Sequence, residues 1–316
     1  ATTFAADTPL AITEFVRGPG IWQNWFWWNL LMGALLGVFL FSRLWKRADV
    51  LTDNELLEIR YSGKPAALLR AFKAGYFAIL YNFIVMGWVI NAMASVVSVM
   101  LNMDKWTAVW ICVAIALLYA ILSGFWGVVV TDLVQFFIAM FGSITLAIIA
   151  VKHVGGMDSL LNKLDALMGS DAVHNSTLKF IPPVPIDDIT TLTFWESPFS
   201  KFIIFITVMW WSHHGTDGGG YIIQRMSSAK NERHALLATL WFNLAHYALR
   251  VWPWIIVAVV SIVMFPLIPG AYNDLGVKAG YPLVMNNLLG PGLKGILIVS
   301  FLAAFMSTID THLNWG

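Results

Sequence analysis

The chain has 316 residues, of which 59% are hydrophobic and only 12% are charged, whereas about a quarter of the residues in an ordinary soluble domain carry a charge. This composition excludes a soluble globular enzyme, because only a lipid bilayer can cover so much apolar surface. A net charge of +1 disfavours nucleic-acid binding, and the lone cysteine, Cys112, excludes an internal disulfide framework. We therefore expect an all-α polytopic membrane protein, embedded in a lipid bilayer, that is not an enzyme and has no nucleic-acid partner.

Windows without charge predict the membrane spans, since about twenty apolar residues cross the hydrocarbon core. In chain order the predicted spans are residues 22–44, 74–103, 106–151 divided in two at Ser123-Gly124, 199–214, 235–268 and 295 to the end. Asp132 is the only charge between Trp106 and Val151, and Arg250 is the charge inside the 235–268 span. Both charges are therefore placed in or near the membrane.

Loop charges set the orientation, because Lys and Arg collect on the cytoplasmic side. The 43–73 loop is predicted to be cytoplasmic, and its basic residues are Arg43, Lys46, Arg47, Arg60, Lys64, Arg70 and Lys73. The 152–197 loop is rich in acids and is predicted to be external. Alternation of the spans then places 215–234 on the cytoplasmic side and 270–293 outside. The charge pattern suits a bacterial inner (plasma) membrane. The first residue is not Met and the chain stops without a helix-ending signal, so we expect a fragment of a longer protein, truncated at both ends.

The last span carries a polar stripe. Ala304, Ser307, Thr308 and Thr311 fall on one helical face, and Asp310 shares its edge. Hydrogen bonding between helices is one interpretation. A cation site is the other, because hydroxyl and carbonyl oxygens replace the hydration shell of a small alkali ion. Sodium takes about five oxygen ligands, so a second helix has to contribute.

Asp132 is the strongest candidate outside that stripe. Thr131, Asp132 and Gln135 cluster on one face of the second helix predicted within 106–151. A buried carboxylate beside a cation stays charged. The carboxylate either handles an ion or forms a structural pair with Arg250 or Lys152. Farther along the chain, Asn243, His246, Tyr247 and Arg250 repeat a polar stripe, which we interpret as interior packing.

Two helices are predicted to be broken. The segment Trp210–Gly220 contains several glycines after a span, and Pro9 lacks a backbone donor near the start of the chain. Interrupted helices in corresponding places indicate a binding site near the membrane midplane. A transition-metal site at His213, His214 and Asp217 is the weaker alternative, since adjacent histidines on a helix point about 100° apart.

Four stretches resemble the sodium/solute symporter family. They are Thr52-Asp-Asn-Glu-Leu-Leu-Glu-Ile-Arg-Tyr61, Ser123-Gly-Phe-Trp-Gly-Val-Val-Val-Thr-Asp-Leu-Val-Gln135, Tyr221-Ile-Ile-Gln-Arg225 and Ala303-Ala-Phe-Met-Ser-Thr308. The resemblance implies a single transport domain with a leucine-transporter-like core of two inverted five-helix repeats. Residues 1–151 would form the first repeat, 152–197 an external loop and 198–316 an incomplete second repeat.

The same resemblance implies specific sites. The principal sodium site would use the carbonyls of Ala1, Phe4 and Ala304 and the hydroxyls of Ser307 and Thr308. A second cation site would use Asp132, Ser307, Asp310 and Thr311, with Asp310 replacing a serine usual in such members. Substrate contacts would come from the broken helices, at Thr3, Asp7, Thr8, Ser212 and His213. Asp7 either attracts an amine or caps the half-helix that follows it.

These sites predict a sodium-coupled symporter that imports a small polar organic solute by alternating access. Sugar carriers of the family place an asparagine and a tyrosine where this chain has Ser212 and Gly215, so a sugar is not the expected solute. Three alternatives stay open: the transporter-like sensor portion of a membrane histidine kinase, a proton-coupled carrier that uses Asp310, and a metalloenzyme that uses His213, His214 and His246.

Overall fold

The computed structural model describes residues 5–50, 52–122, 125–170, 173–185, 193–213 and 215–315, and every regular element within them is helical. In chain order the α-helices are α1 (Thr8–Arg17), α2 (Trp25–Trp28), α3 (Leu30–Leu36), α4 (Ser42–Ala48), α5 (Glu55–Arg60), α6 (Gly63–Gly75), α7 (Asn82–Leu101), α8 (Lys105–Leu122), α9 (Phe125–His153), α10 (Met157–Met168), α12 (Thr193–Glu196), α13 (Pro198–Ile204), α14 (Trp210–Ser212), α15 (Gly220–Ser227), α16 (Glu232–Asn243), α17 (Val251–Met264), α18 (Gly280–Leu288) and α19 (Pro291–Trp315). Two 3₁₀ segments are η1 (Ile21–Asn24) and η8 (Gly270–Ala279), and the π-helical turns are η2 (Gly37–Phe41), η3 (Tyr76–Tyr81), η4 (Val173–Thr177), η6 (Phe205–Met209) and η7 (Leu244–Leu249).

Most π-helical turns join neighbouring α-helices into longer ones. Five helices in the described residues are long and apolar enough to cross a membrane: Ile21–Ala48, Gly63–Leu101, Val130–His153, Glu232–Met264 and Pro291–Leu313. Two shorter apolar helices cover Lys105–Leu118 and Pro198–Ser212. All seven helices fall on spans predicted from the sequence. The division predicted at Ser123-Gly124 lies outside the described residues.

The chain forms two compact units. Unit 1 consists of the described residues up to Phe26, Trp88–Ile203 and Arg250–Asp310, and unit 2 consists of Trp27–Gly87, Ile204–Leu249 and the residues from Thr311 on. Each unit draws on both halves of the sequence. This division is one of packing and not of topology, so the inverted repeats stay a prediction.

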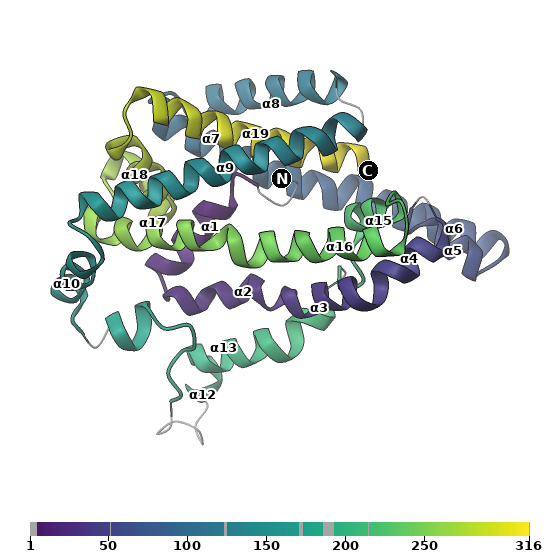
Figure 1. Cartoon of the computed structure of the whole chain (residues 1–316), viewed down its shortest axis with the longest axis horizontal. Coiled ribbons are helices and arrows are strands. Elements are labelled where there is room, and N and C mark those ends of the chain that lie inside the picture. Colours follow the sequence, from purple (N-terminus) through teal and green to yellow (C-terminus); the bar gives the residue numbers. More distant parts are fainter. Residues whose placement is uncertain are drawn as a thin grey trace. The chain divides into compact units, whose positions relative to one another are not determined.

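In unit 1, α17 packs against α1, α9, α10 and α18. Figure 1 shows α9 and α17 side by side, with α18 near the end of α17. Arg17, at the end of α1, donates from Nη1 to the carbonyl of Ser261 at 2.6 Å and from Nη2 to the carbonyl of Phe265 at 2.7 Å. The last carbonyls of a helix have no partner inside it, and a cation there also complements the helix dipole. Arg17 therefore fastens α1 to the end of α17.

The sequence analysis predicted no helix in two places. The region 270–293, expected as an external loop, contains α18, whose residues from Gly280 to Met285 are all buried. A nine-residue helix is too short for a span, and the charge-free stretch around it, residues 279–293, is shorter than the roughly twenty residues that a span needs. Similarly, α10 lies in the predicted external loop and buries Leu160 and Leu164. Both helices are stabilised by packing and not by a long apolar run.

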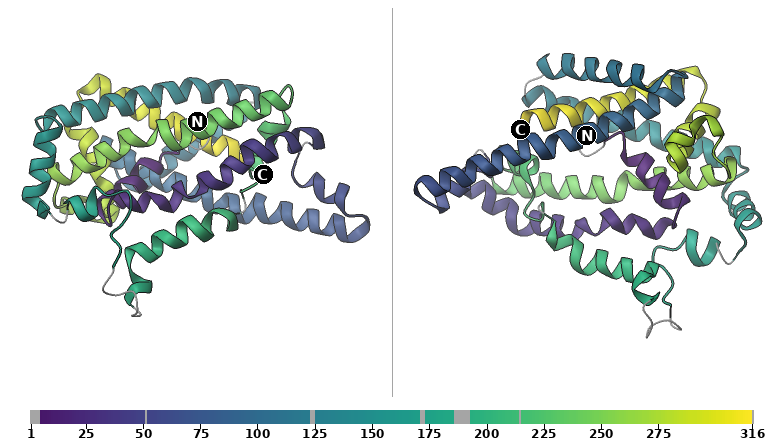
Figure 2. Two further views of the ribbon diagram at one scale, coloured as in Figure 1. Left: turned by 60° about the horizontal axis from the view of Figure 1, so that its bottom comes forward. Right: turned by 180° about the vertical axis from the view of Figure 1, so that it is seen from behind.

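In unit 2, α4 packs against α15 and α16 (Figure 2). A cluster of buried apolar side chains fills this contact: Trp45, Val50, Ile223, Met226 and Ala235. Polar contacts surround it, because Lys46 donates to the Ser227 carbonyl at 2.8 Å and Arg47 pairs with Glu232 through bonds of 2.7 and 3.0 Å. The end of α15 and the start of α16 are thereby held against α4.

Candidate cation and solute site

The helices α9 and α19 are joined by the residues predicted to hold cations. The hydroxyl of Ser307 donates to the carboxylate of Asp132, and both residues are buried, with exposed fractions of 0% and 8%. Ten residues from each, Gly142 faces Leu297: a Cβ at Gly142 would lie 2.9 Å from Leu297 Cδ1. Residue numbers rise along α9 in the direction in which they fall along α19, so the two helices run antiparallel over about 15 Å.

Gly142 leaves room on α9 for the side chain of Leu297. A side chain at this position would meet both Leu297 and Ser300. The contact of Leu297 with Gly142 and the contact of Ser307 with Asp132 belong to one register of the two helices. The resemblance grouped Asp132 with Ser307 in a second cation site, and the contact between the two side chains places Asp132 beside the predicted principal sodium site.

The remaining oxygens of α19 lie within one turn of Ser307. Thr308 is buried, and its hydroxyl donates to the Ala304 carbonyl at 3.0 Å. The Asp310 carboxylate is buried as well, with an exposed fraction of 1%. A hydroxyl that donates to a carbonyl keeps its lone pairs for a cation. The arrangement therefore gathers carboxylate, hydroxyl and carbonyl oxygens away from water and lipid, a donor set that suits a small hard cation.

Thr311 has a different neighbour. In unit 2 its hydroxyl accepts a hydrogen bond from Arg225 Nη2 at 3.2 Å, while Arg225 Nη1 donates to the Tyr221 carbonyl at 3.0 Å. A guanidinium beside a hydroxyl repels a second cation. This contact leaves Thr311 the poorest sodium ligand among the four residues predicted for the second site.

The beginning of α1 supplies the other predicted ligands. Ala1, Thr3 and Phe4 lie outside the described residues. Helix α1 begins at Thr8, and Pro9 is its second residue. A proline is expected there, because the first backbone amides of a helix have no acceptor inside the helix and the missing N–H costs nothing. Asp7 makes no side-chain capping hydrogen bond, and its Oδ1 is buried without a hydrogen-bond partner. Asp7 nevertheless occupies the N-cap position of α1, at the positive end of the helix dipole, so both roles predicted for Asp7 stay predictions.

The predicted break after α14 is present in unit 2. The helix ends at Ser212, His213 is extended, and the chain becomes helical again at Gly220. The Thr216 hydroxyl lies 3.0 Å from the Trp210 carbonyl and 2.8 Å from the His213 carbonyl, so it satisfies groups that the broken helix has released. Gly218 and Gly219 have φ values of 122° and 69°, which only glycine adopts readily.

Ser212 and His213, the predicted substrate contacts from this helix, belong to unit 2, whereas Asp7 and Thr8 belong to unit 1. Ser212 is exposed, and its hydroxyl donates to the Met209 carbonyl at 3.1 Å. The exposed His213 accepts a hydrogen bond at Nδ1 from the Gly215 amide at 3.0 Å, so Nε2 carries the proton in the neutral ring. Both side chains thus have local partners on their own segment.

Sequence reasoning missed a cluster around His312 in unit 2. The amide nitrogen of Asn82 donates to the His312 carbonyl at 3.0 Å, and Asn82 Oδ1 lies 2.8 Å from His312 Nδ1. The imidazole centroid lies 5.6 Å from that of Tyr221 and 6.2 Å from that of Trp315. Two polar residues inside predicted apolar spans, Asn82 and His312, were the available signal.

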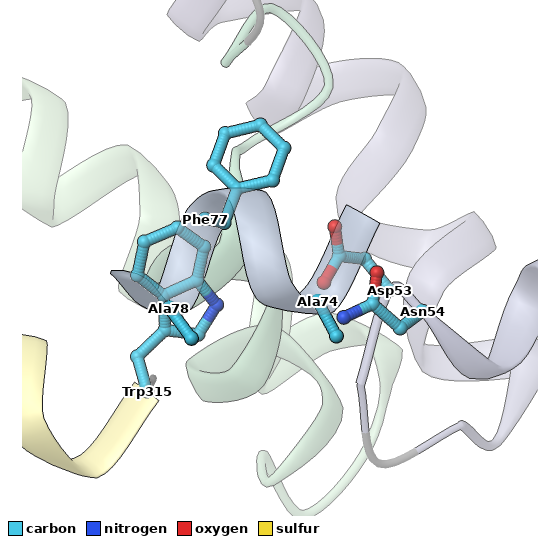
Figure 3. A pocket seen from close by; sticks show the side chains of 6 residues that line it. All are labelled: Asp53, Asn54, Ala74, Phe77, Ala78 and Trp315. Carbon is cyan, nitrogen blue, oxygen red and sulfur yellow. The ribbon is translucent and has the colours of Figure 1, made fainter. Parts of the chain in front are cut away.

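A small pocket opens next to this cluster. Figure 3 shows Asp53 and Asn54 on one side and the rings of Phe77 and Trp315 on the other, with Ala74 contributed by α6. Its volume is about 40 Å³, enough for water but too small for an organic solute. Lys73 Nζ forms an ion pair with Asp53 Oδ2 at 2.7 Å. This pocket is therefore not the solute site.

The metalloenzyme alternative depends on clustered histidines. His214 lies outside the described residues, and in the part of the chain that the structure does describe, no three His, Cys, Asp or Glu side chains are grouped to hold a metal ion. Transition-metal sites need three or four such ligands. The described residues give this alternative no support.

The comparisons with known proteins agree with the geometry. A family model described as "Sodium:solute symporter family" matches residues 8–316. The chain belongs to this family. Sodium/glucose cotransporter 1 of Ovis aries is 26% identical over 314 residues, covering 93% of this chain and 46% of the relative. A sodium/mannose cotransporter of Bos taurus is 25% identical over 309 residues, covering 92% of this chain and 49% of the relative.

A solved structure gives the fold of this symporter-family chain. A Na⁺-coupled sialic acid symporter in a substrate-bound, outward-open state matches with a TM-score of 0.72 and 16% identity, over 99% of this chain and 61% of that one. The chain therefore has the leucine-transporter-like fold and is a multi-pass membrane protein. It spans about half the length of the curated relatives it matches. The family consists of transporters and not enzymes, as the composition predicted.

Proposed function

We propose that this chain is part of a sodium-coupled symporter that imports a small polar organic solute by alternating access. The observation that carries the proposal is the buried contact between Asp132 of α9 and Ser307 of α19, one turn from the Ala304 carbonyl and the Thr308 hydroxyl. A carboxylate buried at membrane depth is costly and marks an ion pathway more often than a packing contact. Family membership supports sodium as the coupling ion.

The principal site in this proposal uses Ala304, Ser307 and Thr308, with the carbonyls of Ala1 and Phe4 completing about five oxygens. Asp132 and Asp310 form a second cation position on the other side of Ser307, and Thr311 contributes only the lone pair that Arg225 leaves unused. Because the Asp132 carboxylate accepts the hydrogen bond from Ser307, it polarises the hydroxyl that the principal site uses. The two positions are thereby coupled through one side chain.

The energy available from one sodium ion is sufficient for uptake. One charge that crosses about 100 mV releases about 2.3 kcal/mol, and a tenfold sodium gradient adds about 1.4 kcal/mol. Their sum supports roughly 500-fold accumulation of solute per sodium ion. Coupling requires that sodium bind one state of the transporter more tightly than the other.

The solute is proposed to contact Asp7 and Thr8 of the first broken helix and Ser212 and His213 of the second, with Thr3 at the start of the chain. The buried, unpartnered oxygen of Asp7 favours a solute with an amine or hydroxyl donor. The sugars in the names of the two cotransporters are substrates of relatives that are only about a quarter identical to this chain. The membrane is proposed to be a cell's inner (plasma) membrane, with the 43–73 loop on the cytoplasmic side.

The test uses the chain reconstituted in liposomes, with uptake of labelled amino acids, carboxylates, polyols and sugars measured with and without an inward sodium gradient. We expect Ser307→Ala with Thr308→Ala to reduce sodium-driven uptake at least tenfold. Ser300→Ala is the matched control, because it removes another buried hydroxyl of α19, one that donates to the Ile296 carbonyl. Unchanged sodium dependence in the double variant would refute the site.

A proton-coupled carrier is the second candidate, and the buried carboxylate of Asp310 favours it. In that case uptake would follow a pH gradient in the absence of sodium, and Asp310→Asn would abolish this drive. Uptake that needs sodium at every pH would exclude it.

A further inference from the structure

The turn between α5 and α6 forms an open hollow in unit 2. Its lining residues are Arg60, Tyr61, Ser62, Pro65, Ala66 and Leu69, and its volume is about 470 Å³. The Arg60 guanidinium lies over the Tyr61 ring, 5.7 Å from the centroid. Ala66 is buried beneath the hollow, whereas Tyr61, Pro65 and Leu69 are exposed. One end of the hollow is therefore cationic and polar, and the other is apolar.

The charges around the hollow do not cancel. Arg70 pairs with Glu58, and Lys73 pairs with Asp53 at 2.7 Å. Arg60 and Lys64 form no ion pair within the part of the chain that the structure describes, and both are exposed. Arg60 thus contributes an uncompensated positive charge to the lining, and Lys64, next to the lining residue Pro65 in the sequence, adds a second one nearby, so an anion would be attracted.

The apolar end of the hollow continues into a stripe on the long helix that begins with α6. Leu68 and Phe72 have exposed fractions of 72% and 69%, and Tyr76, Ile79 and Phe83 continue the stripe at helical spacing. This helix, Gly63–Leu101, has 39 residues, whereas about 20 suffice to cross the hydrocarbon. The charge-free part begins only at Ala74, so the first turns of α6 are expected at the level of the lipid headgroups.

We propose that the hollow binds an anionic phospholipid of the membrane leaflet that adjoins the 43–73 loop. The phosphate would lie near Arg60, Ser62 and Lys64, and an acyl chain would follow Leu69 and Phe72 towards the bilayer core. A guanidinium, a hydroxyl and an ammonium group are the partners that phosphate oxygens require. The proposal depends on the membrane location of the chain and not on sodium coupling.

A lipid explains the surface better than a protein partner does. The stripe from Leu68 to Phe83 passes without interruption from the hollow to residues that the membrane must cover. A protein seated on the hollow would cover only its cationic end and leave the start of this stripe in water, which is unfavourable. The cationic end of the hollow and the apolar stripe together are complementary to a single molecule that has an anionic headgroup and a hydrocarbon tail.

The experiment counts lipids bound to the purified chain by native mass spectrometry during titration with phosphatidylglycerol or phosphatidylcholine. Arg60→Gln with Lys64→Gln removes the two charges. Lys230→Gln with Arg233→Gln is the matched control, because these exposed basic residues belong to the same unit and lie in a segment predicted to be on the same side. Arg60→Lys with Lys64→Arg keeps the charge, and thermal unfolding confirms that each variant folds.

We expect the wild-type chain to prefer phosphatidylglycerol. Two such charges at a lipid surface change the affinity about 30-fold, so Arg60→Gln with Lys64→Gln should weaken phosphatidylglycerol binding at least fivefold. The Lys230/Arg233 variant and the charge-preserving variant should stay within about twofold of the wild type. Equal losses in the two neutralised variants would indicate diffuse electrostatic attraction and overturn the proposal. Equal binding of the two lipids by the wild type, or no loss in the Arg60/Lys64 variant, would overturn it as well.

Discussion

Gly220→Ala, which adds a single methyl group, is the substitution whose effect on stability the structure predicts most sharply. A Cβ at Gly220 would lie 2.0 Å from Trp315 Cε2 and 2.1 Å from Cζ2 and Nε1. The most favourable separation of two non-bonded carbon atoms is about 3.5–4.0 Å. In Gly220→Ala the indole therefore has to move by about 1.5 Å. It cannot do so freely, because its centroid lies 5.8 Å from that of Phe77 and 6.1 Å from that of Tyr221.

The cost can be estimated from these contacts. Forcing an extra methyl group into a packed site costs about 1–3 kcal/mol, and an aromatic pair that is lost costs about 0.5–1.5 kcal/mol more. We expect Gly220→Ala to lower the free energy of unfolding by about 3 kcal/mol, which for a chain of this size lowers the melting temperature by roughly 6 °C. The assay is thermal unfolding of the purified protein in detergent.

Two further variants test the cause. Gly292→Ala adds the same methyl group to α19 where nothing lies within 4 Å, so it should be neutral or slightly stabilising. Trp315→Leu shortens the side chain that Gly220 contacts, and in this background Gly220→Ala should cost less than about 1 kcal/mol. If Gly220→Ala costs the same with and without the indole, the clash with Trp315 is not the reason for glycine at this position.

Three other predictions concern unit 1. Asp132→Asn should reduce binding of radioactive sodium to the purified chain more than tenfold, because an amide keeps the shape but loses the charge; an effect no larger than that of Ser300→Ala would contradict this. Gly142→Val should also weaken sodium binding by separating α9 from α19, and Leu297→Ala should restore part of the loss; absence of rescue would show that Leu297 is not the obstacle. Arg17→Ala should lower the free energy of unfolding by about 2–4 kcal/mol in thermal unfolding, since hydrogen bonds from a charged donor are worth about 1.5–3 kcal/mol each; a change below about 0.5 kcal/mol would show that Arg17 does not fasten α1 to α17.

The spans and the broken helix could be predicted because they depend on local patterns. A stretch of about twenty residues without charge indicates a membrane span directly. Gly218 and Gly219 adopt positive φ values, and glycines at this place indicate a backbone that leaves the helix. The polar stripe of the last helix was likewise visible in the spacing of Ala304, Ser307 and Thr308. Each of these signals is contained within about twenty consecutive residues.

The features that sequence reasoning missed depend on distant pairs. Asn82 and His312 meet although 230 residues separate them, and α18 is helical because its buried residues pack against α17 and α9. No local pattern specifies such a pair, since tertiary packing overrides propensity in a short helix. The pairing of Asp132 with Ser307, which 175 residues separate, came from the family resemblance and not from a local pattern.

The contact between α9 and α19 also limits how the proposed coupling can work. Gly142, Leu297, Asp132 and Ser307 fix these helices in one register, and packed helix pairs move as rigid bodies more readily than they slide. Sodium affinity has to differ between the outward and inward states if the ion is to drive transport. We therefore expect the difference in sodium affinity between the two states to come from the ligands predicted at Ala1 and Phe4 and not from the contact between Asp132 and Ser307. Variants that loosen α9 from α19 should weaken sodium binding in both states, whereas variants at the start of the chain should change the ratio between the states.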